Sequence, residues 1–231
     1  MVRYAVMAGV LLIFLTVLVP MARTQPAENR AAETAIENAD PDAVDPNLIK
    51  GERWTLDFRF DQPEPIVVTT PGGEKEVYWY LVYTVTNLSG EDPPLVPTFT
   101  LYPDTTAVQR AGIYPTVFEA IKKTRKIRFL ENAVQMIGKI LTGEDNARTG
   151  AAIFAPIDRK TKRFTLFVEG LSGEYIERPA RAKEIEPGHL AEGDKLVRLH
   201  KTLALEYQLP GDEWWRNLDQ PIFVDKKWTW R

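Results

Sequence analysis

The chain has 231 residues, 44% of them hydrophobic and 26% charged, and its formal net charge at pH 7 is −3. These values are ordinary for a globular protein and exclude wholesale disorder. A mildly acidic chain lacks the broad basic surface that general nucleic-acid binding requires, so no nucleic-acid partner is expected. The absence of cysteine excludes thiol catalysis, disulfides, zinc-thiolate sites, iron–sulfur clusters and the lipidated cysteine of a bacterial lipoprotein.

The N-terminal segment is an apolar run, Tyr4 to Ala22, which is flanked by Arg3 and Arg23 and contains no charged residue. Its length of 19 residues lies between the apolar core of a cleaved signal peptide and a full membrane span. Cleavage after the run would put Pro20 at position −3, where a small residue is needed. Residues 1–24 are therefore predicted to be an uncleaved membrane anchor or, less well supported, a signal peptide. Both imply export.

Residues 25–50 are rich in Ala, Glu, Asp, Asn and Pro and predict an acidic disordered linker. Pro41 and Pro46 prevent any short helix within it from extending into the folded region. The expected organisation is an anchor or signal peptide at 1–24, the linker at 25–50, and one folded domain at 51–231.

Strand patterns dominate the first half of this domain. Trp54, Leu56, Phe58 and Phe60 alternate with polar residues, which predicts one strand with one buried face. The segment Val77–Asn87 is apolar at both alternating positions before it begins to alternate, as in a central strand covered on one face and partly on the other. A third strand is expected within Val96–Asp104, with Phe99 and Leu101 facing one way.

One helix is expected, from Tyr114 to Lys126. Val117, Phe118 and Ile121 recur at helical spacing, and Pro115 suits the first turn. Most other positions are basic: Lys122, Lys123, Arg125, Lys126 and Arg128. Such a run is more often the solvated face of an amphipathic helix, but it could also contact anionic lipid headgroups.

The next segment, 130–141, fits a strand and a helix about equally, and Gly138 and the β-branched residues favour a strand. Two apolar segments, 151–157 and 163–171, flank the polar loop Asp158–Arg163 and are expected to form a hairpin.

A polar insertion, Glu174–Asp194, precedes a strand within Lys195–Leu209, and the last strand is expected at Ile222–Trp230. Seven to nine strands with one short helix, and no alternation of strands with helices, predict a mainly β fold. The expected architecture is an antiparallel β-sandwich of immunoglobulin-like type.

Several catalytic motifs are incomplete. His189 and His200 have no acidic or histidine partner at ligand spacing and are expected at the surface. Ser172 lacks the glycine that a nucleophile elbow needs two positions later, where the chain has Glu174, and is expected in a turn that ends a strand. Gly72-Gly73 lacks the spacing of a phosphate-binding loop. No metal and no cofactor are predicted.

Paired carboxylates are the remaining route to catalysis. Asp104, Asp158, Glu169 and Glu174 are the candidates for a glycosidase-type acid/base pair, which requires two of them within roughly 5–10 Å across a cleft. Acidic residues are common in loops, so solvated side chains are the favoured interpretation.

The segment Trp214-Trp215-Arg216, after Pro210-Gly211-Asp212, has the strongest character of a binding site. Exposed tryptophans anchor protein partners or sugars. The competing interpretation is structural, because adjacent tryptophans can pin the C-terminal loop to the edge of the sheets.

The segments VYWYLVYTVTN, FTLYPDT, YPTVFEAI, LFVEGLSGEY, KTLALEYQLPGDE and KKWTWR occur in this order along the chain. Over residues 52–231 the chain resembles a family of exported proteins from planctomycete bacteria that has no assigned activity. The resemblance implies a compartment and a bacterial source, and it carries over no functional residue.

The sequence therefore favours a non-enzymatic domain with a binding or structural role in the bacterial cell envelope. The domain is expected in the periplasm, tethered to the inner membrane by the N-terminal helix, or else secreted after signal cleavage. The expected partner is an envelope protein or glycan. The rival hypothesis is a carboxylate-dependent hydrolase of envelope glycans.

Overall fold

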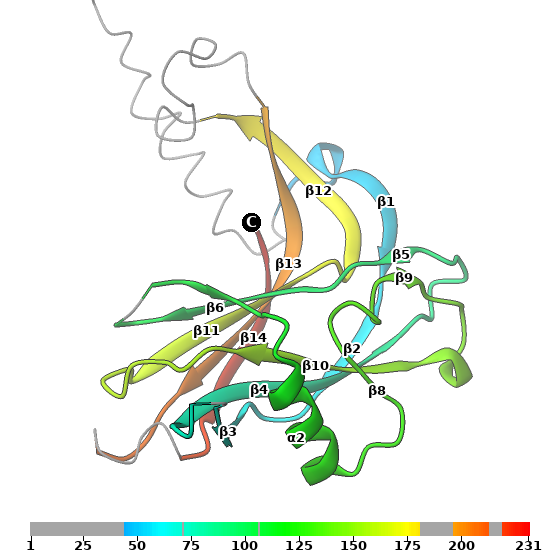
Figure 1. Ribbon diagram of the computed structural model, residues 1–231. Coiled ribbons are helices and arrows are strands. Elements are labelled where there is room, and N and C mark those ends of the chain that lie inside the picture. The colour runs from blue at the N-terminus through cyan, green and yellow to red at the C-terminus, as the bar shows by residue number, and fades with distance from the viewer. Residues whose placement is uncertain (1–43, 71, 106, 181–195, 213–218) are drawn as a thin grey trace, which may run out of the picture.

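The computed structural model describes residues 44–70, 72–105, 107–180, 196–212 and 219–231. Over these residues the chain is mainly β, with antiparallel sheets and a single α-helix (Figure 1), so the expected fold class is confirmed at this level. Within the same residues, no helix has the length and apolar character needed to cross a membrane. The run Tyr4–Ala22 lies outside them.

The described strands form two main sheets and a small ribbon. Seven strands form the large sheet, in the order β1-β12-β13-β11-β6-β7 with β14 also pairing β13: β1 Lys50–Thr55, β12 Ser172–Pro179, β13 Leu196–Gln208, β11 Arg163–Glu169, β6 Thr98–Pro103, β7 Gln109–Arg110 and β14 Ile222–Trp230. Five form the second sheet, β2-β4-β10-β8 with β3 also pairing β4: β2 Asp57–Phe60, β4 Lys75–Thr86, β10 Arg148–Phe154, β8 Leu130–Glu131 and β3 Glu64–Thr69. The ribbon joins β5 Pro94–Leu95 to β9 Gly138–Lys139.

The largest core contains side chains from both main sheets. Alternate residues of β4, among them Trp79 and Leu81, are buried with Leu101, Leu166 and Leu205 from the large sheet. Each such side chain contributes about 1.5–3 kcal/mol through its removal from water. The period-2 pattern of the sequence is the direct source of this core, because alternate side chains of a strand point to the same face.

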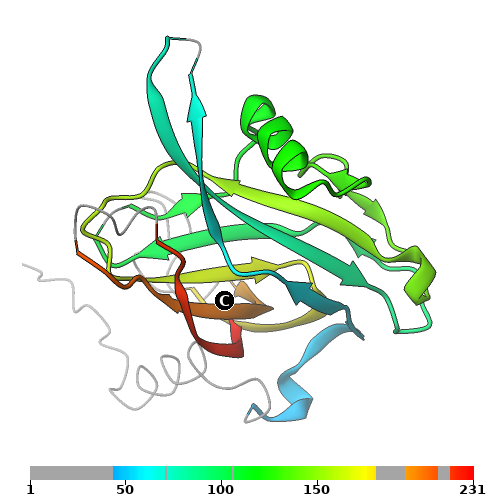
Figure 2. The same cartoon turned by 90° about the horizontal axis from the view of Figure 1, so that it is seen from below.

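The opposite face of β4 carries a second core. Tyr80 and Val82 pack there with Val117, Phe118 and Ile121 of helix α2, Pro115–Arg125. The expected helix is therefore confirmed, with Pro115 in its first turn. Figure 2 shows α2 beside the β3–β4 hairpin, which projects from the body of the domain.

The prediction of one strand from Trp54 to Phe60 is wrong, because this segment contributes to two strands that belong to different sheets. The strand is interrupted at Leu56. The part before it, β1, pairs with β12 in the large sheet, and the part after it, β2, pairs with β4 in the second sheet. The N–H of Leu56 donates to the carbonyl oxygen of Leu171 (2.8 Å), which lies in the short connection between β11 and β12. The alternation identified the buried face correctly, but it carries no information about the partner strand.

The predicted hairpin across residues 151–171 is also wrong. Strand β10 pairs β4 and β8, whereas β11 pairs β6 and β13. The loop Asp158–Arg163 therefore connects the two sheets. A polar loop between two apolar strands looks the same in sequence whether the strands pair or face each other across a core.

The segment 130–141 does not form the continuous strand that Gly138 and the β-branched residues favour. Only the short strands β8 and β9 occur there, and the chain turns between them. The side chain of Asn132 accepts hydrogen bonds from the N–H groups of Val134 and Gln135. Asparagine competes with ladder hydrogen bonds in this way, which explains the turn.

The start of the expected polar insertion is part of a strand. Residues Ser172–Pro179 form β12 between β1 and β13, and residues 181–195 lie outside the described part of the chain. Polar side chains are accommodated because Glu174 pairs with Lys201 (2.7 Å) and Glu177 pairs with Lys50 (2.6 Å) and Arg198 (3.0 Å).

The end of the expected linker also packs on the domain. Val44 is buried with Ile176, Leu199 and Trp230, and the short 3-10 helix η2, Pro46–Leu48, leads into β1. Residues before 51 therefore contribute to the folded domain.

Candidate functional site

A pocket of about 230 Å³ lies beside helix α2. We call it the α2 pocket. It lies between α2, strand β10 and the segment 130–135, and its lining is Gly112, Ile113, Tyr114, Pro115, Phe118, Glu119, Lys122, Leu130, Asn132, Ala133, Gln135, Ala151 and Ile153. Its lining mixes apolar side chains with polar ones such as Glu119, Lys122 and Asn132, and its volume is below that of most drug-sized sites.

A second pocket, of about 160 Å³, lies on the other side of the same loop. The two pockets share Ile113, Tyr114 and Pro115, which form a ridge at the start of α2. The ridge is held by a hydrogen bond from Gly112 N–H to the carbonyl oxygen of Ile153 (2.8 Å) and by contact of the Tyr114 and Tyr78 rings, 5.1 Å apart.

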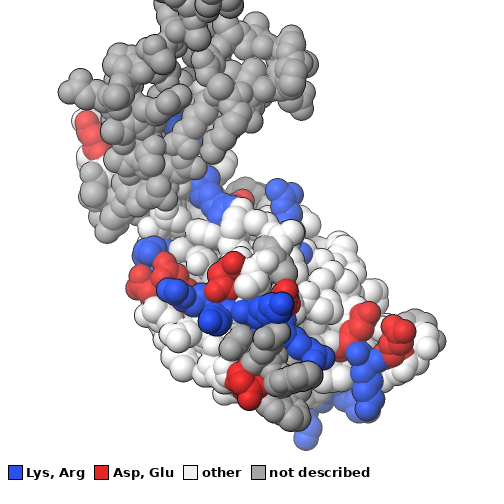
Figure 3. Space-filling view, turned by 90° about the vertical axis from the view of Figure 1, so that its left-hand side faces the viewer, with Lys and Arg blue, Asp and Glu red and all other residues white. Residues whose placement is uncertain are grey.

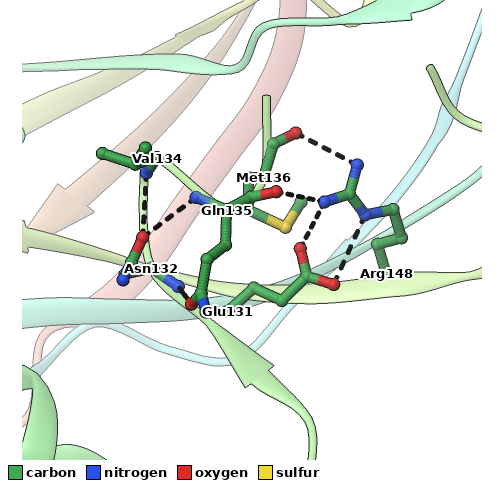
Figure 4. Close-up of polar contacts among 6 residues, drawn as sticks. All are labelled: Glu131, Asn132, Val134, Gln135, Met136 and Arg148. Atoms are coloured by element: carbon green, nitrogen blue, oxygen red, sulfur yellow. Dashed lines mark hydrogen bonds and ion pairs between the residues drawn. The ribbon is translucent and has the colours of Figure 1, made fainter. Parts of the chain in front are cut away.

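Arg148 fixes the opposite wall of the α2 pocket (Figure 4). Its guanidinium pairs with Glu131 and donates to the backbone carbonyl oxygens of Gln135 and Met136, the latter at 3.3 Å. The Met136 side chain is fully buried in the main core. Charge and core packing therefore both hold this loop in place, and a wall that is held before binding loses less entropy when a ligand binds.

The C-terminal end of α2 is fixed by a separate polar cluster. Arg125 pairs with Asp61 and with Glu64 (2.7 Å), and the Tyr80 hydroxyl donates to Glu64 (2.6 Å). Burial and this hydrogen bond raise the pKa of Tyr80 to about 12. Arg125 therefore holds the helix on the second sheet, and it differs in role from the exposed Lys122 beside it in the basic run.

The three residues with the strongest binding character in the sequence, Trp214, Trp215 and Arg216, lie outside the described residues, as does His189. His200 is exposed on β13, with its ring 5.9 Å from that of Tyr175. Within the described residues, no group of three or more His, Asp or Glu side chains is placed to hold a metal ion.

Ser172 and the glycine pair have structural surroundings. Ser172 is the buried first residue of β12, and not part of a turn; its hydroxyl donates to the carbonyl oxygen of Trp54 (3.0 Å) and accepts from Glu174 N–H (3.2 Å). Gly72 and Gly73 lie in the turn between β3 and β4, where Gly73 N–H donates to the carbonyl oxygen of Thr70 (2.9 Å).

The four candidate carboxylates divide between different parts of the large sheet. Asp104 accepts from Lys162 N–H (3.0 Å) and Asp158 from Lys160 N–H (2.9 Å), so both belong to one loop cluster. Glu169 is at the other end of β11, roughly 20 Å from the Asp104 end at the usual rise of a strand. Glu174 pairs with Lys201. Asp104 and Asp158 are thus the two that the fold brings to one place.

Surface charge on one face of the molecule is mixed. Figure 3 shows Lys and Arg side chains interspersed with Asp and Glu side chains there. Ion pairs of the described residues, such as Lys227 with Glu206 (2.5 Å), contribute little stability when exposed, so their main effect is on solubility.

Sequence reasoning found helix α2 but missed the pocket. Its far wall is built by the loop after β8, which the sequence pattern predicts to be a strand, and by β10, for which the pattern predicts the wrong partner strand. The one local signal was Asn132, a turn-forming residue inside an apolar segment. Comparison with protein-family models, with curated proteins and with solved structures finds no match to the chain.

Proposed function

We propose that this protein is a membrane-tethered β-sandwich of immunoglobulin-like type that binds a component of the bacterial cell envelope through the α2 pocket. The apolar run at residues 4–22 supports the tether, and two sheets around a shared core support the sandwich. The observation that carries the binding role is the preformed wall, in which Arg148 holds the loop 131–136 open beside α2. The domain would work in the periplasm, or outside the cell if the leader is cleaved.

The pocket is tested by site-specific crosslinking, which the chain allows because it has no cysteine. A benzophenone is attached to the full chain at Val134→Cys, on the exposed rim, and the chain is irradiated in native membranes. We expect a discrete crosslinked product that disappears when Ala133→Trp fills the pocket. The matched control is the same label at Val224→Cys on β14. Equal products at both positions, or none at Val134→Cys, would refute binding at this pocket.

The tether is tested on the same preparation. Alkaline extraction of the membranes is expected to leave the full chain in the pellet, with an N-terminal mass that includes residues 1–24. A mature start near residue 23 or 25 would support the secreted alternative.

The rival function is hydrolysis of envelope glycans, and one observation favours a particular pair for it. Asp104 and Asp158 accept hydrogen bonds from the same loop, from Lys162 N–H and Lys160 N–H, so they are the two candidates that the fold brings nearest to the arrangement of an acid/base pair. The test is release of soluble sugars from purified peptidoglycan by the full chain. Activity that is lost in both Asp104→Asn and Asp158→Asn, and kept in Glu169→Gln, would replace the binding proposal.

A further inference from the structure

Three large apolar side chains in contact with solvent lie at or next to residues that line the α2 pocket. Ile113 lines the pocket and is 64% exposed, Phe129 directly precedes the lining residue Leu130 and is 75% exposed, and Val134 lies between two lining residues and is 57% exposed. Single exposed apolar residues are common on protein surfaces, but a group of them around one opening marks an interaction site.

The stretch that begins at the pocket with Lys122 is basic. Lys122 lines the pocket, and Lys123, Lys126 and Arg128 follow it as exposed residues of the same stretch. Glu119 is the one acidic residue among the pocket's lining, and the other nearby acid, Glu131, is paired with Arg148. The local charge is therefore strongly positive, in a chain whose total charge is negative.

The helix dipole accounts for only some of the basic residues in this stretch. Lysines in the last turn of a helix are favoured by its dipole, which accounts for Lys122 and Lys123. Arg128 lies beyond the helix, and its guanidinium is 5.1 Å from the centre of the Phe129 ring, which it covers without removing it from water. A basic group stacked on an exposed aromatic ring, next to aliphatic side chains, is the composition of a lipid–water interface.

We infer that the α2 face, defined by Ile113, Lys122, Lys123, Lys126, Arg128, Phe129 and Val134, contacts the headgroups of an anionic membrane, with Phe129 inserted. The inference rests on the proposed function and names the envelope component that meets this site. Charge complementarity selects anionic lipid over a neutral one, because each lysine near such a surface strengthens contact about fivefold.

The tether permits this contact. In Figure 1 the α2 end lies opposite the end where β1 begins, so the domain must lean or turn to bring α2 to its own membrane. A chain of the length of residues 25–43 reaches at most roughly 65 Å. A domain of this size is roughly 40 Å across, so that reach is sufficient.

The test uses the full chain with one environment-sensitive fluorophore, NBD, at Phe129→Cys. The chain is reconstituted in vesicles of phosphatidylcholine alone or with phosphatidylglycerol. NBD emission is expected to rise only with phosphatidylglycerol and to return to baseline at 1 M salt, where screening limits charge interactions to about 3 Å. The same label at Val224→Cys, on the other sheet and 55% exposed, is expected not to respond.

Two variants show whether charge causes the response. Replacing Lys122, Lys123 and Lys126 with Ala is expected to lower the ratio of docked to undocked domain roughly 100-fold, whereas Arg at the same positions should retain it. Arg125 is left unchanged because it pairs with Asp61 and Glu64. No rise with phosphatidylglycerol, an equal rise on neutral vesicles, or a rise only with lipid-free envelope protein would overturn the inference.

Flotation of the vesicles after a salt wash separates this inference from the proposed tether. A chain that floats without a fluorescence response keeps the tether and loses the lipid contact. A chain that responds at low salt and fails to float after the wash keeps the lipid contact and loses the tether.

Discussion

The clamp formed by Arg148 gives the most direct test of how the α2 pocket is built. In Arg148→Met the side chain keeps the bulk of its aliphatic part and loses the guanidinium, so Glu131 loses its ion pair and the carbonyl of Met136 loses a donor. The exposed carbonyl of Gln135 can bind water instead. Arg148 and Glu131 are 21% and 29% exposed, which places the pair between a surface and a buried one.

Hydrogen bonds to charged groups contribute about 1.5–3 kcal/mol each. With the water-accessible bond discounted, Arg148→Met is expected to lower the free energy of unfolding by about 2–4 kcal/mol. A double-mutant cycle with Glu131→Gln should give a coupling of about 1–2 kcal/mol. The matched control is Arg59→Met. The ion pair of Arg59 with Asp57 is exposed, so its loss is expected to lower the free energy of unfolding by less than about 1 kcal/mol.

The assay is urea denaturation combined with amide hydrogen exchange of residues 131–137. Exchange in this loop should speed up in Arg148→Met and stay unchanged in Arg59→Met. If Arg148→Met is within about 1 kcal/mol of the unmodified protein and the loop exchanges at its normal rate, the pocket wall is not held by this residue.

Two further predictions concern strain and pH. Gly170 and Gly90 both have positive φ, +82° and +85°, but an added Cβ at Gly170 would lie 2.3 Å from the carbonyl oxygen of Val96, whereas Gly90 has open space. Thermal unfolding should therefore show a cost of about 1 kcal/mol for Gly90→Ala and a clearly larger cost for Gly170→Ala; equal costs would contradict the contact. The pKa of Tyr80 is about 12 in the folded protein, against an ordinary value of 10.0 that applies to the unfolded chain. Its contribution to the free energy of unfolding is therefore complete below pH 10 and is lost between pH 10 and 12. Stability should fall there by at most about 1.4 kcal/mol per pH unit, and less steeply in Tyr80→Phe; identical slopes would contradict the assignment.

Local periodicity predicted which residues of this chain are buried. The alternation through Trp54, Leu56 and Phe58, and the helical spacing of Val117 and Ile121, each identified side chains that the structure buries. These patterns succeed because strand and helix geometry alone decide which side chains share a face.

Strand pairing could not be predicted in the same way. The partners of β10 and β11 depend on which sheet each strand joins, and the residues of the intervening loop do not encode that choice. The α2 pocket shares this limit, since its walls come from a helix, a strand and a turn that meet only through pairing. Its lysines were visible in the sequence, but the separate role of Arg125 follows from Asp61 and Glu64, roughly 60 positions earlier in the chain.

The strand interruptions at Leu56 and Leu171, which are joined by a hydrogen bond, also decide how the domain would carry a pulling force applied at its N-terminal end. A load applied at residue 44 first meets the packing of Val44 against Ile176 and Trp230 and then, in β1, the ion pair between Lys50 and Glu177. Because β1 and β12 are antiparallel neighbours, the ladder between them is loaded along its length. At Leu56 the chain enters the second sheet through β2, so both sheets share the load while α2 lies outside its path. Tension on the tether is thereby separated from the surface that we propose to bind.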